Sequence, residues 1–339
     1  MRDDEPVVVT DQLTKKYGRM TALDSLSISL QRGQILGFIG PNGAGKTTTI
    51  KILVGLARPT SGSARVAGAD CVREARKIKR MVGYMPDVFG SYDNMRVREY
   101  LDFFGAAFRI PRRERGKRIG EALEMAGATY MQDRYVESLS FGMKQRVAIA
   151  RTLLHDPEVL FLDEPASGLD PAARIEMREA LLRLAEAGKT LIVTSHILPE
   201  LSRICDRVAI ITGGKLRAFG TLDEITRCVS QRRTIEAQLA TAEQIDAAVG
   251  QIAELVGEGA EATGSAAEGM VRFQFRGTEG ELGEVLSRLI GAGIRVTQFR
   301  ELGADLEDAF LSLIQPKAAP DDATEASGGG AAARNAAGG

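Results

Sequence analysis

The sequence predicts an α/β fold built on a parallel sheet, followed by a small α+β domain. Short apolar runs alternate with amphipathic helical segments from residue 34 to residue 196, as in a parallel sheet covered by helices. From about residue 227 the pattern changes, and residues 316–339 are rich in Ala and Gly without apolar periodicity. We therefore expect three parts: residues 1–226, residues 227–315 and a disordered tail over residues 316–339.

The first predicted elements are two antiparallel strands. Residues 7–17 and 22–30 alternate apolar and polar side chains, and Gly18 and Arg19 lie between them. Tyr17 ends the first strand. Its spacing alone allows two interpretations: an ordinary tyrosine at a strand end, or a ring that stacks on a nucleotide base.

A glycine-rich loop follows an apolar strand at residues 34–39 and fits the pattern G-x-x-x-x-G-K-[ST]. Glycines let backbone N–H groups curl around phosphate oxygens, and the helix expected over residues 48–56 adds positive potential at its N-terminus. In this pattern the lysine reaches the β- and γ-phosphates, and the next hydroxyl ligates Mg²⁺. We therefore predict that the chain binds a nucleoside triphosphate. The loop residues are Gly40, Pro41, Asn42, Gly43, Ala44, Gly45, Lys46, Thr47 and Thr48.

A second group of motifs begins at Ser140, which is expected to cap a helix whose apolar positions recur every three or four residues. The apolar run at residues 159–165 is then a buried strand that carries Asp163 and Glu164 at its C-terminal end. Beside a phosphate loop, such a pair suggests that Asp163 holds Mg²⁺ and that Glu164 orients or deprotonates the attacking water. The alternative is an acidic strand end exposed to solvent.

The remaining segments complete the predicted order of elements. A buried strand at residues 190–195 ends at His196, and this position at the ligand edge of a parallel sheet favours a γ-phosphate contact over a structural role. Other strands are expected at residues 64–66, 81–84, 207–212, 215–219, 234–239, 270–275 and 294–299. Helices are expected at residues 72–79, within 97–125, from Pro171, and at 242–256, 280–290 and 306–313, with a loose loop over 257–269.

Composition narrows the class of protein. The 44 Lys and Arg residues balance 45 Asp and Glu residues, so the global basic excess of many nucleic-acid-binding proteins is missing, although local patches remain possible. Cys71, Cys205 and Cys228 are widely separated, which supports neither a disulfide framework nor a zinc site and favours a reducing cytosol. We expect no signal peptide and no transmembrane helix, so a partner would hold the protein at any membrane.

Five motifs in this order resemble those of the ATP-binding subunits of ABC transporters. The resemblance covers roughly residues 7–226 and implies a P-loop NTPase (RecA-like) core with an antiparallel β subdomain and a helical subdomain. It also implies that Tyr17 is the aromatic residue that stacks on the nucleotide base. Residues 232–315 resemble, more loosely, a small C-terminal domain found on many exporters. The matched stretches are residues 40–48 (Walker A), 139–145 (signature), 160–164 (Walker B), 167–170 (D-loop) and His196 (switch histidine).

The resemblance implies a head-to-tail homodimer or heterodimer around two molecules of ATP with Mg²⁺. Lys46, Glu164 and His196 would be the catalytic residues, while Thr47 and Asp163 would hold the metal. Each ATP on one subunit would be closed over by the signature residues Ser140, Gly142 and Met143 of the other subunit, with Asp170 beside them. A helix N-terminus with free N–H groups suits a γ-phosphate.

The chain departs from the family pattern at two places. Phe141 and Met143 replace the first Gly and the Gln of the usual Leu-Ser-Gly-Gly-Gln signature. Asp87 stands where the family usually has Gln, and it could contact Mg²⁺ or water. The loop over residues 87–92, with Phe89 and Tyr92, resembles the surface that grips a coupling helix of the membrane partner.

The predicted function is that of a motor subunit that drives export through a separate transmembrane permease, on the inner face of the cell membrane. One alternative is a soluble ABC ATPase acting on DNA or ribosomes, but the chain holds one cassette and no long heptad insertion between Lys46 and Asp163. The other alternative is a weakly hydrolysing regulatory module, which the retained Glu164 and His196 oppose.

Overall fold

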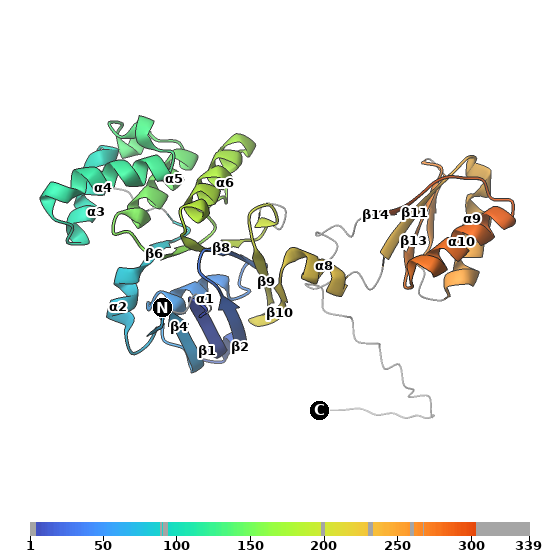
Figure 1. Ribbon diagram of the computed structural model, residues 1–339, viewed down its shortest axis with the longest axis horizontal. Helices are drawn as coiled ribbons and strands as arrows, with labels where there is room; N and C mark the ends of the chain where they lie inside the picture. Colours follow the sequence, from blue (N-terminus) through green and yellow to red (C-terminus); the bar gives the residue numbers. More distant parts are fainter. Residues whose placement is uncertain are drawn as a thin grey trace, which may run out of the picture.

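Three sheets carry the fold of this protein (Figure 1). The computed structural model describes residues 5–88, 90, 94–197, 201–229, 233–257, 261–266 and 268–302. The central sheet has six strands in the order β10-β9-β3-β8-β7-β6. These strands are β3 (Ile35–Ile39), β6 (Val82–Met85), β7 (Val159–Leu162), β8 (Thr190–Ser195), β9 (Arg207–Thr212) and β10 (Lys215–Gly220).

Five of the six central strands run parallel, and only β10 is antiparallel to its neighbour β9. Every residue of β3, β7 and β8 is buried, which explains why these strands appear in the sequence as continuous apolar runs. The turn between β9 and β10 uses Gly213 and Gly214 at φ 57° and 77°, the left-handed conformations that a tight two-residue hairpin needs. The predicted parallel sheet and this hairpin are both confirmed.

The predicted N-terminal strand pair is part of a second sheet, in the order β2-β1-β4-β5. β1 (Val8–Tyr17) and β2 (Met20–Leu30) pair antiparallel, and β1 also pairs with β4. Their alternating side chains bury one face against the central sheet and α1, as period-two patterning requires. The other two strands are β4 (Ser61–Val66) and β5 (Ala69–Asp70).

Helices cover the central sheet, and apolar clusters form on both of its faces. Along β3, Ile35 and Ile39 join the cluster that contains α3 to α6, whereas Leu36 and Phe38 join the cluster of α1 and the second sheet. The helical signal over residues 97–125 divides into two helices, with Pro111 preceding the second. The helices are α1 (Lys46–Leu53), α2 (Ala75–Met81), α3 (Val97–Ala107), α4 (Arg112–Met125), α5 (Phe141–Leu153), α6 (Pro171–Glu186) and α8 (Leu222–Val229), with 3₁₀ turns at Thr129–Met131 and Val136–Ser138.

The third sheet forms an α+β unit over residues 233–302, which we call the C-terminal unit. Its four antiparallel strands have the order β12-β13-β11-β14, and two helices contribute to one shared apolar cluster with them. The chain order β-α-β-β-α-β with this strand order is a ferredoxin-like arrangement. The elements are β11 (Arg233–Leu239), a 3₁₀ turn (Ala242–Gln244), α9 (Ile245–Val256), β12 (Thr263–Ser265), β13 (Met270–Phe275), α10 (Glu279–Gly291) and β14 (Val296–Leu302).

One expectation for the C-terminal unit was wrong. The stretch over residues 257–269 is not only a loop, because it contains the edge strand β12 paired with β13. Its sequence lacks the apolar alternation of a strand, and Gly264 packs so closely against Ile245 of α9 that no side chain fits there. The helix predicted at residues 306–313 and the tail over residues 316–339 lie outside the described residues. Across the described ranges, no helix is both long enough and apolar enough to cross a membrane.

Candidate functional site

Three neighbouring strands bring the predicted site residues to one edge of the central sheet. β8 lies between β3 and β7, so that Ile39 is level with Ser195 and Leu162 with Val193. Because parallel strands end at the same edge, the phosphate loop after β3, the two acids after β7 and His196 after β8 meet there. The sequence patterns therefore identified one common edge from three separate stretches.

The phosphate loop wraps around the N-terminus of α1. Gly45 has φ 111°, and a Cβ atom there would lie 2.7 Å from the backbone oxygen of Ala22, so the loop needs glycine at this position. Lys46 is only 6% exposed, and its ammonium group donates hydrogen bonds to the carbonyls of Gly40 (2.6 Å) and Pro41 (3.4 Å). A buried ammonium group held by backbone carbonyls is ready to exchange them for phosphate oxygens.

Asp163 is fully buried at the end of β7, with one oxygen paired and one unpaired. Its Oδ1 accepts a hydrogen bond from the Thr194 hydroxyl (2.7 Å), and the Thr47 hydroxyl is close enough to lower the pKa of the carboxyl group. Its Oδ2 is buried with no hydrogen-bond partner within the described part of the chain. Burial raises the pKa of Asp163, the charges of Asp87 and Glu164 raise it further, and the two hydroxyl groups oppose the shift. An unpaired carboxylate oxygen beside a threonine hydroxyl fits a hard cation such as Mg²⁺.

Glu164 lies between Lys46 and His196. One carboxylate oxygen, Oε2, is 2.9 Å from Nδ1 of His196, and the other, Oε1, is 3.2 Å from the Lys46 ammonium, an ion-pair distance without hydrogen-bond geometry. The backbone of Glu164 adopts φ 53°, and its N–H group donates to the Thr194 hydroxyl (2.8 Å). A non-glycine residue in this conformation is held there by its surroundings, as is common at functional sites.

Thr194 was missed by the sequence reasoning, although its hydroxyl group holds both acids in place. It accepts from the Glu164 backbone and donates to the Asp163 carboxylate, and it is completely buried. A polar residue near the C-terminal end of an otherwise apolar strand was the available signal.

The signature residues form a different surface, at the N-terminus of α5. Ser140 caps the helix as predicted, since its hydroxyl accepts from the Met143 N–H at 3.3 Å. Gly142 packs on α6, where a Cβ atom would lie 3.1 Å from that of Ala173, and the exposed Phe141 ring covers Gly168. Among the described residues, no recorded contact joins Ser140, Gly142 or Met143 to the phosphate loop. Asp170 caps α6 through the Ala173 N–H at 2.9 Å.

Tyr17 and Asp87 are both exposed. The Tyr17 ring is 47% exposed, and the Lys15 ammonium lies 4.7 Å from its centroid. The charge of Asp87 raises the pKa values of Asp163 and Tyr84, which shows that the Asp87 carboxylate faces this edge. Phe89 and Tyr92 lie outside the described residues.

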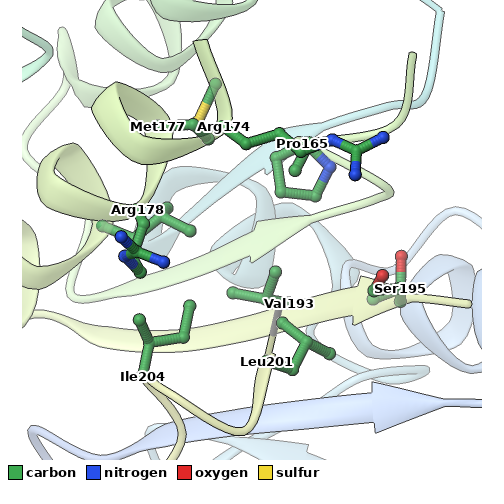
Figure 2. Close-up of a pocket in the computed structure, with 11 residues that line it drawn as sticks. Pro165, Arg174, Met177, Arg178, Val193, Ser195, Leu201 and Ile204 are labelled. Carbon is green, nitrogen blue, oxygen red and sulfur yellow. The ribbon is translucent and has the colours of Figure 1, made fainter. Parts of the chain in front are cut away.

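A small cavity of about 50 Å³ lies behind the acids, between α6, β8 and residues 201–204. Figure 2 shows Val193, Leu201 and Ile204 on one side, opposite Met177 and Arg178 of α6. Its lining is mainly apolar and includes no part of the phosphate loop. The predicted site residues therefore lie at the strand ends and outside this cavity.

Comparison with known proteins gives one consistent family. The family described as ABC transporter matches residues 23–167. The bacitracin transport ATP-binding protein BcrA of Bacillus licheniformis is 36% identical over 310 residues, which cover 91% of this chain and 97% of that protein. The probable multidrug ABC transporter ATP-binding protein YbhF of Escherichia coli is 38% identical over 242 residues, which cover 71% of this chain. The chain spans only 40% of the length of YbhF.

A solved structure agrees with these sequence matches. The chain resembles the dimeric structure of MJ0796, a bacterial ABC transporter cassette, with a TM-score of 0.58 and 27% sequence identity. That likeness covers 63% of this chain and 98% of the cassette.

Proposed function

The chain belongs to the family of ABC transporter ATP-binding proteins, and from this premise we propose that it is an ATP-hydrolysing motor subunit that drives export through a separate membrane permease. The observation that carries the proposal is the position of Glu164, held between Lys46 of the phosphate loop and His196 of the neighbouring strand. The fold class and the family resemblance expected from the sequence are both confirmed.

In this proposal, Lys46 and the backbone amides of residues 40–48 bind the triphosphate, and Tyr17 stacks on the base. Thr47 and Asp163 hold Mg²⁺, with Asp87 adding negative charge nearby. When bound, the metal neutralises charge on the phosphate oxygens. The unpaired Oδ2 atom of Asp163 supports this assignment, because a buried carboxylate oxygen without a partner is costly unless a ligand completes it.

Glu164 is the proposed base for the attacking water. Triphosphate binding draws the Lys46 ammonium toward the phosphate oxygens, which releases Glu164 from its ion pair and leaves one oxygen free to accept a proton from water. The other oxygen stays bonded to His196, which fixes the carboxylate and places an imidazole at the γ-phosphate edge. Lys46, Glu164 and His196 therefore act as one unit in this mechanism.

The proposal also includes a head-to-tail dimer in which the signature of one subunit closes the site of the other. Its support is that the capped α5 terminus presents Ser140, Gly142 and Met143 away from any recorded contact with the phosphate loop of the same described chain. A helix N-terminus is a natural partner for a γ-phosphate, and a second copy supplies it. The related MJ0796 cassette is described as dimeric.

Export through a permease is supported by the relatives and by a groove. BcrA is a bacitracin transport protein, and other relatives are described as Nod factor export proteins. A groove of about 250 Å³ runs between the core and the helical part, with apolar side chains that suit a helix from a membrane protein. Docking there would hold the protein at the inner face of the membrane. Apolar residues in this groove are Val54, Leu56, Val82, Tyr84, Phe104 and Phe108.

The substitution Glu164→Gln tests the mechanism. We expect turnover to fall by about 10²-fold or more while ATP binding persists, because the amide retains the shape of the carboxylate but accepts no proton. Size-exclusion chromatography with ATP and Mg²⁺ should then show a stable dimer. The exposed acid Glu179→Gln on α6 is the matched control and should leave turnover unchanged. Unchanged turnover in Glu164→Gln would remove this residue from catalysis.

A further inference from the structure

Two short segments concentrate positive charge in a chain that is otherwise acidic. Residues 73–80 contain five Lys and Arg residues against one Glu, and residues 109–118 contain six against one. Together they carry a net charge of +9, although the whole chain has a net charge of −1. The charge balance of the whole chain therefore conceals a strongly basic region.

The fold brings the two segments together around one groove of about 660 Å³. Lys79 and Arg80 come from the last turn of α2, whereas Arg109 and Arg118 come from the start of the α3–α4 connection and from α4. Apolar side chains also line the groove, including Phe108, whose ring stacks on His155 with centroids 4.3 Å apart. The groove thus combines cations with apolar surface.

Three of the cations are not neutralised by the protein. Lys79, Arg80 and Arg109 are exposed, and no ion pair is recorded for them among the described residues. The one acid that lines the groove, Glu114, lies 3.4 Å from Arg113. Arg109 has a left-handed backbone (φ 63°) fixed by hydrogen bonds that end α3, so its place at the groove is set by the fold. Uncompensated cations around a concave surface attract a polyanionic ligand.

The groove lies away from the nucleotide edge. α2 leads directly into the N-terminal end of β6, and the end of α5 leads into the N-terminal end of β7. The triphosphate loop follows the C-terminal end of β3 and the acids follow the C-terminal end of β7, at the opposite edge of the same parallel sheet. The basic groove is therefore a separate site from the one proposed for ATP.

We propose that this groove binds the headgroup of an anionic phospholipid and holds the protein on an acidic membrane surface. Lys79, Arg80 and Arg109 bind the phosphate and other headgroup oxygens, while Ile110 and Pro111, which also line the groove, contact the apolar part of the lipid. Single-stranded nucleic acid fits less well, because such sites offer several aromatic faces and Phe108 is the one Phe, Tyr or Trp among the lining residues. This inference does not require the proposed export function.

The test is sedimentation of the purified full-length protein with two kinds of vesicle. We expect binding to vesicles of phosphatidylcholine that contain about one-third phosphatidylglycerol, and little binding to pure phosphatidylcholine. The triple variant Lys79→Glu/Arg80→Glu/Arg109→Glu should lower partitioning by at least about tenfold, since each basic residue near an anionic surface contributes substantially. Raising the salt concentration should weaken wild-type binding through screening.

The control is a variant with the same charge change elsewhere, Arg65→Glu/Arg288→Glu/Arg295→Glu, at exposed positions outside the groove. It should bind anionic vesicles nearly as wild type does, and both variants should keep the wild-type ATPase rate. Equal losses of vesicle binding in the two variants would mean that only net charge matters, and they would refute the groove as the binding site. Release of the protein from vesicles by millimolar inorganic phosphate at constant ionic strength would also overturn it, in favour of a site for soluble anions. Failure of ATPase activity in wild type would affect only the proposed function.

Discussion

The nucleotide edge and the C-terminal unit each bury one carboxylate, and they treat it in opposite ways. Asp163 is fully buried, accepts a hydrogen bond from the Thr194 hydroxyl and keeps one oxygen unpaired within the described part of the chain, and burial raises its pKa. Glu236 on β11 is 4% exposed, but Arg272 and Arg300 contact both of its oxygens at 2.6–2.9 Å. Hydrogen bonds from Arg272 and then Arg300 lower the pKa of Glu236.

This difference separates a binding group from a structural one. A buried acid whose partners are all supplied by the protein needs nothing further, and its charge is stabilised by fixed guanidinium groups. A buried acid whose oxygen has no hydrogen-bond partner lowers the stability of the fold until a ligand binds to that oxygen. Burial alone therefore does not distinguish the two carboxylates, whereas the unpaired oxygen of Asp163 does.

Removal of one cation from each region, Lys46 beside Glu164 and Arg272 beside Glu236, should give the largest difference between the two regions. We expect Lys46→Ala to weaken ATP binding by about 10²-fold or more, because it removes the ammonium group that reaches the phosphates and leaves Glu164 without its ion pair. Arg272→Ala is the matched control and should leave ATP affinity unchanged. Isothermal titration with ATP and Mg²⁺ measures both, and wild-type affinity in Lys46→Ala would refute the assignment of the phosphate loop.

Neutralising Asp163 should lower activity but raise stability. The fold raises the pKa of Asp163 above its ordinary value of 3.8, because it favours the neutral carboxyl group. The stability that this preference contributes is fully present below pH 3.8 and is lost as the pH rises through the folded pKa. At pH 7, Asp163→Asn should therefore increase the free energy of unfolding by about 1 kcal/mol while abolishing Mg²⁺-dependent turnover. Denaturant unfolding at pH 7 and pH 4 checks this, since the gain should shrink at the lower pH. A loss of stability at pH 7 would contradict the comparison.

The opposite sign is expected for Glu236. Its pKa is lowered in the folded protein, so the stabilisation is present above the ordinary value near 4.5 and is lost as pH falls through the folded pKa. Glu236→Gln should cost about 1 kcal/mol at pH 7, a small effect because both guanidinium groups are half-exposed to solvent. The difference from wild type should shrink as the pH falls below 4.5 and through the folded pKa of Glu236.

The same variant tests the domain division. We propose that residues 227–315 fold as a separate domain, since the apolar cluster of the C-terminal unit shares no residue with the two clusters of the core. Scanning calorimetry of the full chain should then show that Glu236→Gln shifts one transition and leaves the other, together with ATPase activity, unchanged. One shared transition that moves as a whole would argue against the division.

The sequence was sufficient for the parallel sheet, because apolar runs such as residues 159–162 have no other simple interpretation in a strand–helix alternation. It also predicted that Asp163 and Glu164 follow a buried strand directly, and the structure shows that strand as β7. The sequence could not predict the hydrogen bonds between side chains on different strands. The bonds from Thr194 to both acids join residues about 30 positions apart, and no local pattern encodes them.

In the C-terminal unit, the sequence likewise predicted some strands but not the contacts between strands. β13 was predicted at its observed bounds, because residues 270–275 alternate strictly. The edge strand β12 was missed, since three residues containing Gly264 carry no periodic signal and become a strand only by pairing with β13. Likewise, the triad around Glu236 depends on strand register, which places Arg272 and Arg300 opposite it on β13 and β14.

The smallest expected effect concerns the acid that departs from the family pattern. Asp87 is exposed, and its charge raises the pKa of the buried Asp163 from nearby. If Asp87 only substitutes for the usual Gln, then Asp87→Gln should keep ATPase turnover within about twofold, because an exposed charge is screened by solvent. Removing that charge should also lower the pKa of Asp163, so the pH profile of turnover should move slightly to lower pH. Asp87→Asn, which keeps the shorter side chain, separates the effect of charge from that of length. A loss of about tenfold or more in both variants would show that the carboxylate itself contacts the metal or the water, and Asp87 would then join Asp163 as a second acid at the nucleotide edge.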